Sequence, residues 1–244
     1  MPKTARTQLN TLAAAEHRRS IWVRIGVTAA LVAFALIVGI IVIASRDSST
    51  QTAAEPTSVT ETGALRAASP NVELAEGARS PKRVLTIYED FQCPVCKNFE
   101  ATFGSNLDEL RTSGIAAIDY HPIAILDRMS STDYSTRAAN ASLCVADSSI
   151  DTWLGFHSAA YEQQPAEGGS GLTDEELTDM AVAAGAPDTV QDCITGGHYA
   201  DWVGDSTRSV LETNINATPT VLLNGEPLDL STPAALDAAV RAIP

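Results

Sequence analysis

Two cysteines separated by two residues, Cys93 and Cys96, are the side chains in this sequence best suited to carry out chemistry. A thiolate attacks a disulfide sulfur through a mixed-disulfide intermediate, so such a pair can exchange a disulfide with another protein. A free cysteine, with a pKa of about 8.5, is only a few per cent thiolate at neutral pH. The positive end of a helix stabilises a thiolate, and we therefore expect Cys93, the first of the pair, to be the nucleophile. Cys96, one turn later and more buried, is expected to close the disulfide or to resolve a mixed disulfide.

The sequence around the two cysteines predicts a strand that leads directly into a helix. Residues 84–88 form a short apolar run rich in strand-forming residues. After the motif, apolar residues recur at the spacing of one helix face: Phe99, Phe103, Leu107 and Leu110. Pro94 suits a first helical turn because it has no N–H to leave unbonded, and Val95 completes the dipeptide between the cysteines. The motif is therefore predicted at a helix N-terminus.

Two other roles for the Cys-x-x-Cys pair are weaker. Half of a zinc site would need further ligands, usually a second close pair of cysteines or histidines. The remaining cysteines, Cys144 and Cys193, are far apart in the sequence, and no two histidines have zinc-site spacing. An inert structural disulfide is disfavoured because a strand-to-helix junction is expected to expose the first sulfur. Thiol–disulfide exchange itself requires no metal and no diffusible cofactor.

Cys144 and Cys193 fall in segments predicted to be helical. The simplest pairing joins them to each other, with two free buried cysteines as the alternative. A loop of about 50 residues closed in this way stabilises a protein by roughly 4 kcal/mol in the chain-entropy model.

Other residues near the motif are weaker candidates for function. Glu89 and Asp90 immediately precede it and are candidates for moving protons, although acids in loops are more often simply solvated. Thr218 and Pro219 precede another predicted strand, and on the sequence alone a trans proline is favoured, because only about 5% of X–Pro bonds are cis. The histidines are expected to have packing or surface roles: His17, His121, His157 and His198.

The N-terminal part of the 244-residue chain differs sharply in charge from the rest. Residues 1–24 carry five basic residues and one acid, a net charge of +4, so a chain total of −14 leaves −18 for the remainder. This acidic remainder argues against nucleic acid as a partner. Residues 25–44 carry no charge and, at 1.5 Å per residue, span about 30 Å, the thickness of a hydrocarbon core. They are predicted to form a transmembrane helix, with residues 1–24 in the cytoplasm and the chain after Ala44 outside the membrane. A cleaved signal peptide is the alternative.

The rest of the chain is predicted to consist of a linker and one folded domain. Residues 45–70 are expected to be a disordered linker, since ten of these 26 residues are Ser or Thr and none is aromatic. Residues 71–244 are long enough to bury a substantial core. Within them, residues 115–121 and 220–223 are predicted to be strands, and residues 132–213 to be helical.

Five stretches of sequence together resemble the DsbA-type thiol–disulfide oxidoreductases, and most closely the membrane-anchored members in actinobacteria such as mycobacteria. They are Phe91-Gln-Cys-Pro-Val-Cys-Lys-Asn-Phe99, Ala139-Asn-Ala-Ser-Leu-Cys144, Trp153-Leu-Gly-Phe-His157, Asp192-Cys193 and Ala217-Thr-Pro-Thr-Val-Leu-Leu-Asn-Gly225. The likeness covers about residues 75–240. It implies an α/β thioredoxin fold with an inserted helical subdomain at about 132–213, preceded by the N-terminal transmembrane helix.

The resemblance also implies roles for particular residues. Thr218 and Pro219 would form the cis-proline loop that packs against Cys93 and contacts the client protein. A second disulfide within the helical part is expected in actinobacterial members, which fits Cys144 with Cys193.

Two departures from the best-studied strong oxidants leave the redox potential open. Those proteins have His where this chain has Val95, and they carry a buried acid within the preceding strand, where this chain offers Thr86 or Ile87.

The function implied is an extracytoplasmic oxidase that introduces disulfide bonds into unfolded or reduced exported proteins. Its membrane partner for reoxidation would be a vitamin K epoxide reductase homologue or a DsbB-like quinone reductase. The same chemistry run in reverse, as a disulfide reductase or isomerase, is the first alternative. A non-catalytic chaperone or interaction module of the cell envelope is the second.

Overall fold

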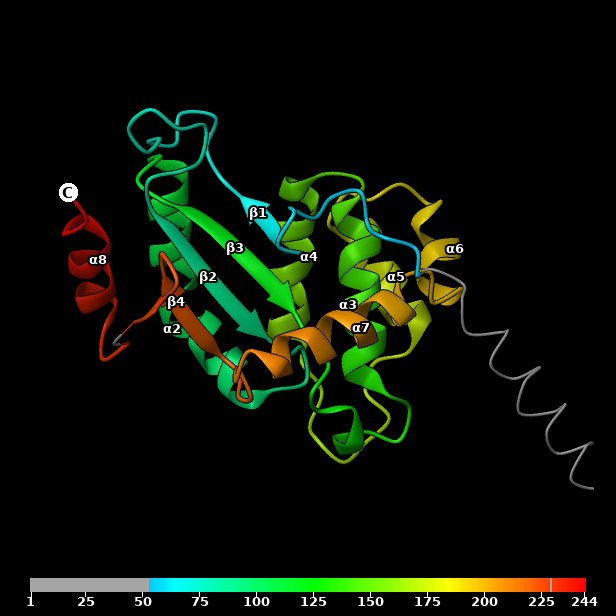
Figure 1. Ribbon diagram of the computed structural model, residues 1–244. Helices are drawn as coiled ribbons and strands as arrows, with labels where there is room; N and C mark the ends of the chain where they lie inside the picture. Colours follow the sequence, from blue (N-terminus) through cyan, green and yellow to red (C-terminus); the bar gives the residue numbers. More distant parts are fainter. Residues whose placement is uncertain (1–52, 229) are drawn as a thin grey trace, which may run out of the picture. The chain divides into compact units, whose positions relative to one another are not determined.

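The structure, a computed structural model, describes residues 53–228 and 230–244. This part of the chain contains a five-stranded sheet in the order β1-β3-β2-β4-β5 (Figure 1). The strands are β1 (Leu65–Ala67), β2 (Val84–Glu89), β3 (Ala117–Pro122), β4 (Thr220–Leu223) and β5 (Glu226–Pro227). β2 and β3 are parallel, and the other neighbouring strands are antiparallel. The strands predicted at 84–88, 115–121 and 220–223 correspond to β2, β3 and β4.

The described part of the chain also contains helices. They are α2 (Pro94–Thr112), α3 (Tyr134–Ala146), α4 (Ile150–Glu162), α5 (Asp174–Ala183), α6 (Val190–Thr195), α7 (Ala200–Glu212) and α8 (Pro233–Arg241), with a short 3-10 helix, η1 (Asp127–Met129). α2 contacts β3, α4 and α8, and α4 also contacts β1. Helices α3 to α7 follow β3 and precede β4, so they occupy the segment predicted to be a helical insertion (Figure 1).

The centre of the sheet positions the strand-to-helix junction. β2 lies between β3 and β4, and its alternate residues Leu85, Ile87 and Glu89 are buried. Every residue of β3 is buried, as expected for a strand covered on both faces. Because β2 is held on both edges, the chain that leaves its carboxyl end has a fixed starting point for α2.

The prediction that residues 45–70 form a disordered linker is wrong for the C-terminal part of this range. Leu65 and Ala67 are fully buried in β1, which pairs antiparallel with β3. Between them, Arg66 forms a bidentate ion pair with Asp119 of β3, with N–O distances of 2.7 and 2.6 Å. β1 contributes only two buried apolar side chains, and the polar composition of the whole segment conceals it.

The segments predicted to form the cytoplasmic basic tail (1–24) and the transmembrane helix (25–44) lie outside the described residues. Across residues 53–228 and 230–244, none of the helices combines the length and the hydropathy needed to cross a bilayer.

Candidate active site

The Cys-Pro-Val-Cys motif lies between the end of β2 and the first turn of α2. Cys93 is the N-cap residue, with an extended backbone (φ −74°, ψ 117°), and Pro94 is the first helical residue. The N–H of Cys93 donates to the carbonyl of Asp90 (2.9 Å), which closes the short connection from the strand. The apolar stripe predicted from the sequence is buried and holds α2 against the sheet: Phe99, Phe103, Leu107 and Leu110. The predicted location of the motif at a helix N-terminus is therefore confirmed.

Cys93 and Cys96 are both free thiols in this structure. Cys93 is 6% exposed and Cys96 is 1% exposed, so the expectation of a well-exposed first sulfur is wrong. Both residues between them, Pro94 and Val95, are exposed, and Val95 is 59% exposed. The pair therefore presents its dipeptide, rather than its sulfurs, to solvent.

The two thiols differ strongly in acidity. The pKa of Cys93 is lowered to about 5, first by a hydrogen bond from the Cys96 side chain. Burial opposes this shift, while hydrogen bonds from the Thr218 side chain and from the N–H groups of Cys96 and Val95 add to it. These N–H groups belong to the first turn of α2, where they have no partner within the helix. The pKa of Cys96 is raised, first by its hydrogen bond to Cys93 and then by burial. At neutral pH the first sulfur is a thiolate and the second a thiol.

The loop before β4 reaches this pair. The peptide bond between Thr218 and Pro219 is cis, as the family resemblance implies and contrary to expectation from the sequence alone. The Sγ of Cys93, when protonated, donates to the carbonyl of Thr218 at 3.3 Å. β4 begins at Thr220 and pairs with β2, so the sheet brings together residues that are 125 positions apart in the sequence.

Gln164, just after α4, is a contact that the sequence analysis missed. Its Nε2 donates to the carbonyl of Phe91 at 2.9 Å and to the carbonyl of Cys93 at 3.0 Å. It thereby ties the helical part of the protein to the backbone of the motif. No pattern in the sequence marks it, because a single glutamine about 70 residues away carries no positional signal.

Asp90 is fully buried and anchors the chain around the motif. Its Oδ1 accepts hydrogen bonds from the N–H of Gln92 (2.8 Å) and the hydroxyl of Ser135 (2.7 Å). Its Oδ2 accepts from the N–H groups of Ile125 (2.9 Å) and Leu126 (3.0 Å). Burial raises its pKa to about 6, and the hydrogen bonds oppose that shift. The alternative of a simply solvated loop acid is therefore wrong.

Glu89, the last residue of β2, pairs with a buried histidine of α4. Its two carboxylate oxygens lie 2.9 and 3.0 Å from Nε2 of His157, and both residues are 2% exposed. Burial alone lowers the pKa of His157, but the charge of Glu89, the hydrogen bond to it and the charge of Glu100 together raise the pKa above its usual value. Positions 86 and 87 carry no acid, and the buried acid of β2 is Glu89 at its end. His157 combines packing with an ion pair.

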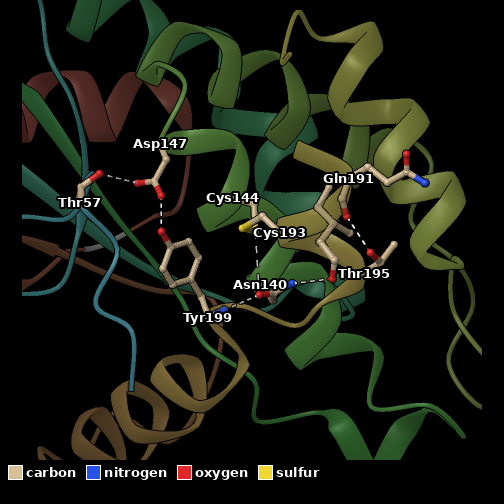
Figure 2. Close-up of a disulfide and its surroundings, with 9 residues drawn as sticks. Thr57, Asn140, Cys144, Asp147, Gln191, Cys193, Thr195 and Tyr199 are labelled. Atoms are coloured by element: carbon tan, nitrogen blue, oxygen red, sulfur yellow. Dashed lines mark hydrogen bonds between the residues drawn. A yellow bond between two sulfur atoms is a disulfide. The ribbon is translucent and has the colours of Figure 1, made fainter. Parts of the chain in front are cut away.

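The second pair of cysteines forms a disulfide, which is the pairing expected above (Figure 2). Cys144 of α3 and Cys193 of α6 have Cα atoms 5.9 Å apart. Asn140 of α3 reinforces the same junction, because its Nδ2 donates to the carbonyl of Ile194 (3.1 Å) and its Oδ1 accepts from the N–H of Tyr199 (2.7 Å). Three attachments therefore hold α6 and the start of α7 to α3.

Segments far apart in the sequence also meet beside this disulfide. The hydroxyl of Tyr199 donates to one carboxylate oxygen of Asp147, and the hydroxyl of Thr57 donates to the other at 3.0 Å (Figure 2). Thr57 belongs to the segment expected to be disordered, so this contact is a second attachment of that segment to the domain.

Comparison with known proteins agrees with this geometry. The thioredoxin family profile matches residues 71–242, more than half of the chain. DsbA from Mycobacterium tuberculosis, in its reduced crystal structure, is 39% identical with a TM-score of 0.68, over 74% of this chain and 91% of that chain. The reduced disulfide oxidoreductase DsbG of the same organism is 40% identical with the same TM-score, over 74% of this chain and 86% of that chain.

Two more distant matches carry less information. The thiol–disulfide oxidoreductase MdbA from Corynebacterium diphtheriae is 20% identical with a TM-score of 0.62, over 81% of this chain and 98% of that chain, which shows the fold alone. The serine/threonine-protein kinase PknE of Mycobacterium tuberculosis is 32% identical over 154 residues, or 59% of this chain. This chain spans only 27% of the length of that kinase.

Three observations lead to one conclusion. The fold is α/β and thioredoxin-like, the start of α2 carries one cysteine with a lowered pKa and one with a raised pKa, and the similarity to mycobacterial relatives is extensive. The chain belongs to the DsbA-like thiol–disulfide oxidoreductases of the thioredoxin family.

Proposed function

We propose that this oxidoreductase introduces disulfide bonds into exported proteins, with Cys93 and Cys96 as its catalytic pair. The observation that carries the proposal is the pKa of about 5 at Cys93. A stabilised thiolate favours the reduced form of the enzyme, and an enzyme with a stable reduced form is a strong oxidant. The low pKa also makes Cys93 a good leaving group in the last step of transfer.

The reaction transfers two electrons from the client protein to the enzyme. A client thiolate attacks Sγ of Cys93 in the oxidised enzyme, the Cys93–Cys96 bond breaks, and Cys96 leaves as a thiolate that takes up a proton. A second client thiolate then attacks the client sulfur of the mixed disulfide. The client disulfide forms, and Cys93 leaves as the thiolate stabilised at the start of α2.

Thr218 and Pro219 are proposed to contact the client while it is bound to Cys93. Support comes from the 3.3 Å contact between the Cys93 sulfur and the Thr218 carbonyl, which places this loop beside the reacting atom. Pro94 and Val95, between the two cysteines, are exposed at the surface. The client backbone is proposed to approach the sulfur beside this dipeptide and the Thr218–Pro219 loop.

Glu89 and Asp90 are proposed to transfer protons to and from the Cys96 sulfur during this exchange. The backbone N–H of Asp90 donates to the Cys96 sulfur and opposes the rise of its pKa, whereas the charge of Glu89 contributes to that rise. With a pKa near 6, Asp90 itself exchanges protons close to neutral pH. Its four hydrogen bonds also give it a structural role, which any variant at this position would disturb.

The segment 25–44 is proposed to anchor the enzyme in the cell membrane, with residues 1–24 in the cytoplasm and residues 71–244 as the extracytoplasmic catalytic domain. Each turnover leaves the cysteine pair reduced, so an oxidant must act next. A membrane quinone reductase, either a vitamin K epoxide reductase homologue or a DsbB-like protein, is the proposed reoxidising partner. The acidic catalytic region supports no role for nucleic acid.

The test is the equilibrium reduction potential of the Cys93–Cys96 pair in the purified full chain, measured against glutathione. We expect a value near the roughly −120 mV of a strongly oxidising DsbA. A value near the roughly −270 mV of thioredoxin would reject the oxidase in favour of a reductase. A Cys93→Ala variant that promotes refolding of a reduced protein as well as the parent does would instead establish a non-catalytic chaperone.

A further inference from the structure

A cavity of about 590 Å³ lies between α2 and α4, over β3. Its walls include Ala101 and Gly104 from α2, Leu154 and Tyr161 from α4, and Tyr120 from β3. This volume lies within the roughly 300–1,000 Å³ of small-molecule sites, and the combination of aromatic walls with a few polar groups is typical of them. Neither the two reactive cysteines nor the Thr218–Pro219 loop lines it.

Glu100 places a carboxylate in this cavity without a hydrogen-bond or ion-pair partner among the described residues. Its side chain is partly buried and makes no hydrogen bond or ion pair with any residue that the structure describes. Burial raises its pKa. The three basic residues of the cavity wall have other hydrogen-bond partners: Lys97 donates to the carbonyl of Glu162 (3.1 Å), Arg111 pairs with Asp108 (2.6 Å), and His157 pairs with Glu89 (2.9 Å). The charge of His157 nevertheless acts on Glu100 and opposes the rise of its pKa. The Glu100 carboxylate is therefore available to a ligand.

Gly104 explains why this carboxylate lies against the cavity wall. Glycine is less favourable than alanine within a helix, so its presence in α2 calls for a reason. A Cβ atom at position 104 would lie 2.5 Å from Oε1 of Glu100. The glycine leaves the space that the carboxylate occupies, one helical turn along from its own Cα. Any side chain with a Cβ atom at position 104 would force the Glu100 carboxylate to move.

We propose that this cavity binds a small organic cation, whose ammonium group pairs with Glu100 and whose apolar body lies among Tyr120, Leu154 and Tyr161. A partly desolvated carboxylate is a strong acceptor for charged N–H donors, and aromatic rings add cation–π attraction. An anion would be repelled by the negative charge of Glu100. This site goes beyond the proposed oxidase function and does not depend on it.

The test measures binding of three probes of similar size to the full chain by titration calorimetry: 2-phenylethylamine, 2-phenylethanol and phenylacetate. We expect the amine to bind at least about tenfold more tightly than the alcohol, and phenylacetate to bind most weakly. Glu100→Gln is expected to reduce amine binding to the level of the alcohol without changing alcohol binding. Glu109→Gln, at an exposed acid of the same helix that does not line the cavity, is the matched control and should change nothing.

Gly104→Ala provides a second variant that keeps every charge. It favours the helix, so the protein should fold, but it displaces the carboxylate and should weaken amine binding alone. The proposal is overturned if the amine binds no better than the alcohol, or if its advantage survives Glu100→Gln. A Cys93→Ser variant should retain amine binding in full, so failure of the oxidase function and failure of this site give different results.

Discussion

Cys93 and Cys96 lie at the start of α2 as free thiols, whereas Cys144 and Cys193 join α3 to α6 in a disulfide. Around Cys93, the hydrogen bonds come from the Cys96 side chain, the Thr218 side chain and the first N–H groups of a helix, all of which stabilise a negative sulfur. Reduction is therefore favoured there. The protein environment, rather than the cysteine itself, gives this pair its acidity.

Next to the second pair, by contrast, the side chain of Asn140 hydrogen-bonds to the backbone. The two amide groups bonded by Asn140, at Ile194 and Tyr199, lie on either side of the connection from α6 to α7. They fix that connection to α3 independently of the sulfur atoms. The two environments fit the proposed division of roles, in which the first pair exchanges electrons and the second restrains the chain. Variants of each pair separate these two roles.

The largest expected effect is on activity. Cys93→Ser should reduce oxidation of a dithiol peptide by the full chain to the uncatalysed rate, because a hydroxyl cannot form the mixed disulfide. The double variant Cys144→Ala/Cys193→Ala should retain the parent rate. The measurement is the fluorescence change of a peptide with two cysteines in a glutathione buffer. Equal loss of rate in both variants would show that the two pairs do not have separate roles.

The next effect is on stability. The variant Cys144→Ala/Cys193→Ala should lose about 4 kcal/mol of unfolding free energy, since the pair closes a loop with a sequence separation of 49 residues. Denaturant unfolding without reductant measures this change. Asn140→Ala, with the disulfide intact, should cost less, about 1–3 kcal/mol, because it leaves buried backbone groups unbonded. No loss of stability in the double variant would contradict a restraining role for the disulfide.

The smallest effect is a shift in a titration curve. The thiolate absorbance of the reduced parent should rise with a midpoint near pH 5. Cys96→Ala should move this midpoint upward, because the Cys96 hydrogen bond is the largest cause of the low pKa. The Cys144→Ala/Cys193→Ala variant should leave it unchanged. A parent midpoint near the ordinary value of about 8.5 would contradict the stabilised thiolate.

The same low pKa predicts how the stability of the reduced enzyme depends on pH. A thiol with a pKa of about 5 in the folded state and an ordinary value near 9 when unfolded binds fewer protons when folded across that interval. The reduced enzyme should therefore gain stability relative to the oxidised enzyme as pH rises above about 5, and lose that gain as pH falls through 5. Denaturant midpoints of both forms at several pH values measure the difference.

Local sequence was sufficient to predict β2, the start of α2 and the placement of Cys93 at its N-terminus. Those features depend on neighbouring residues: a short apolar run, a proline in the first turn and an apolar stripe at helical spacing. The edge strand β1 was missed because its three residues lie within a Ser- and Thr-rich segment, and only pairing with β3 reveals it.

Long-range packing alone decided the surroundings of the reactive sulfur. The sequence predicted that Cys93 is the nucleophile, but the contacts with Thr218 and Gln164 depend on strand pairing and on the helical insertion. The same holds for the burial of Asp90 and for the ion pair between Glu89 and His157. Spacing along a chain determines which residues share one helix or strand, whereas pKa and burial depend on which elements pack together. That packing is a property of the whole core.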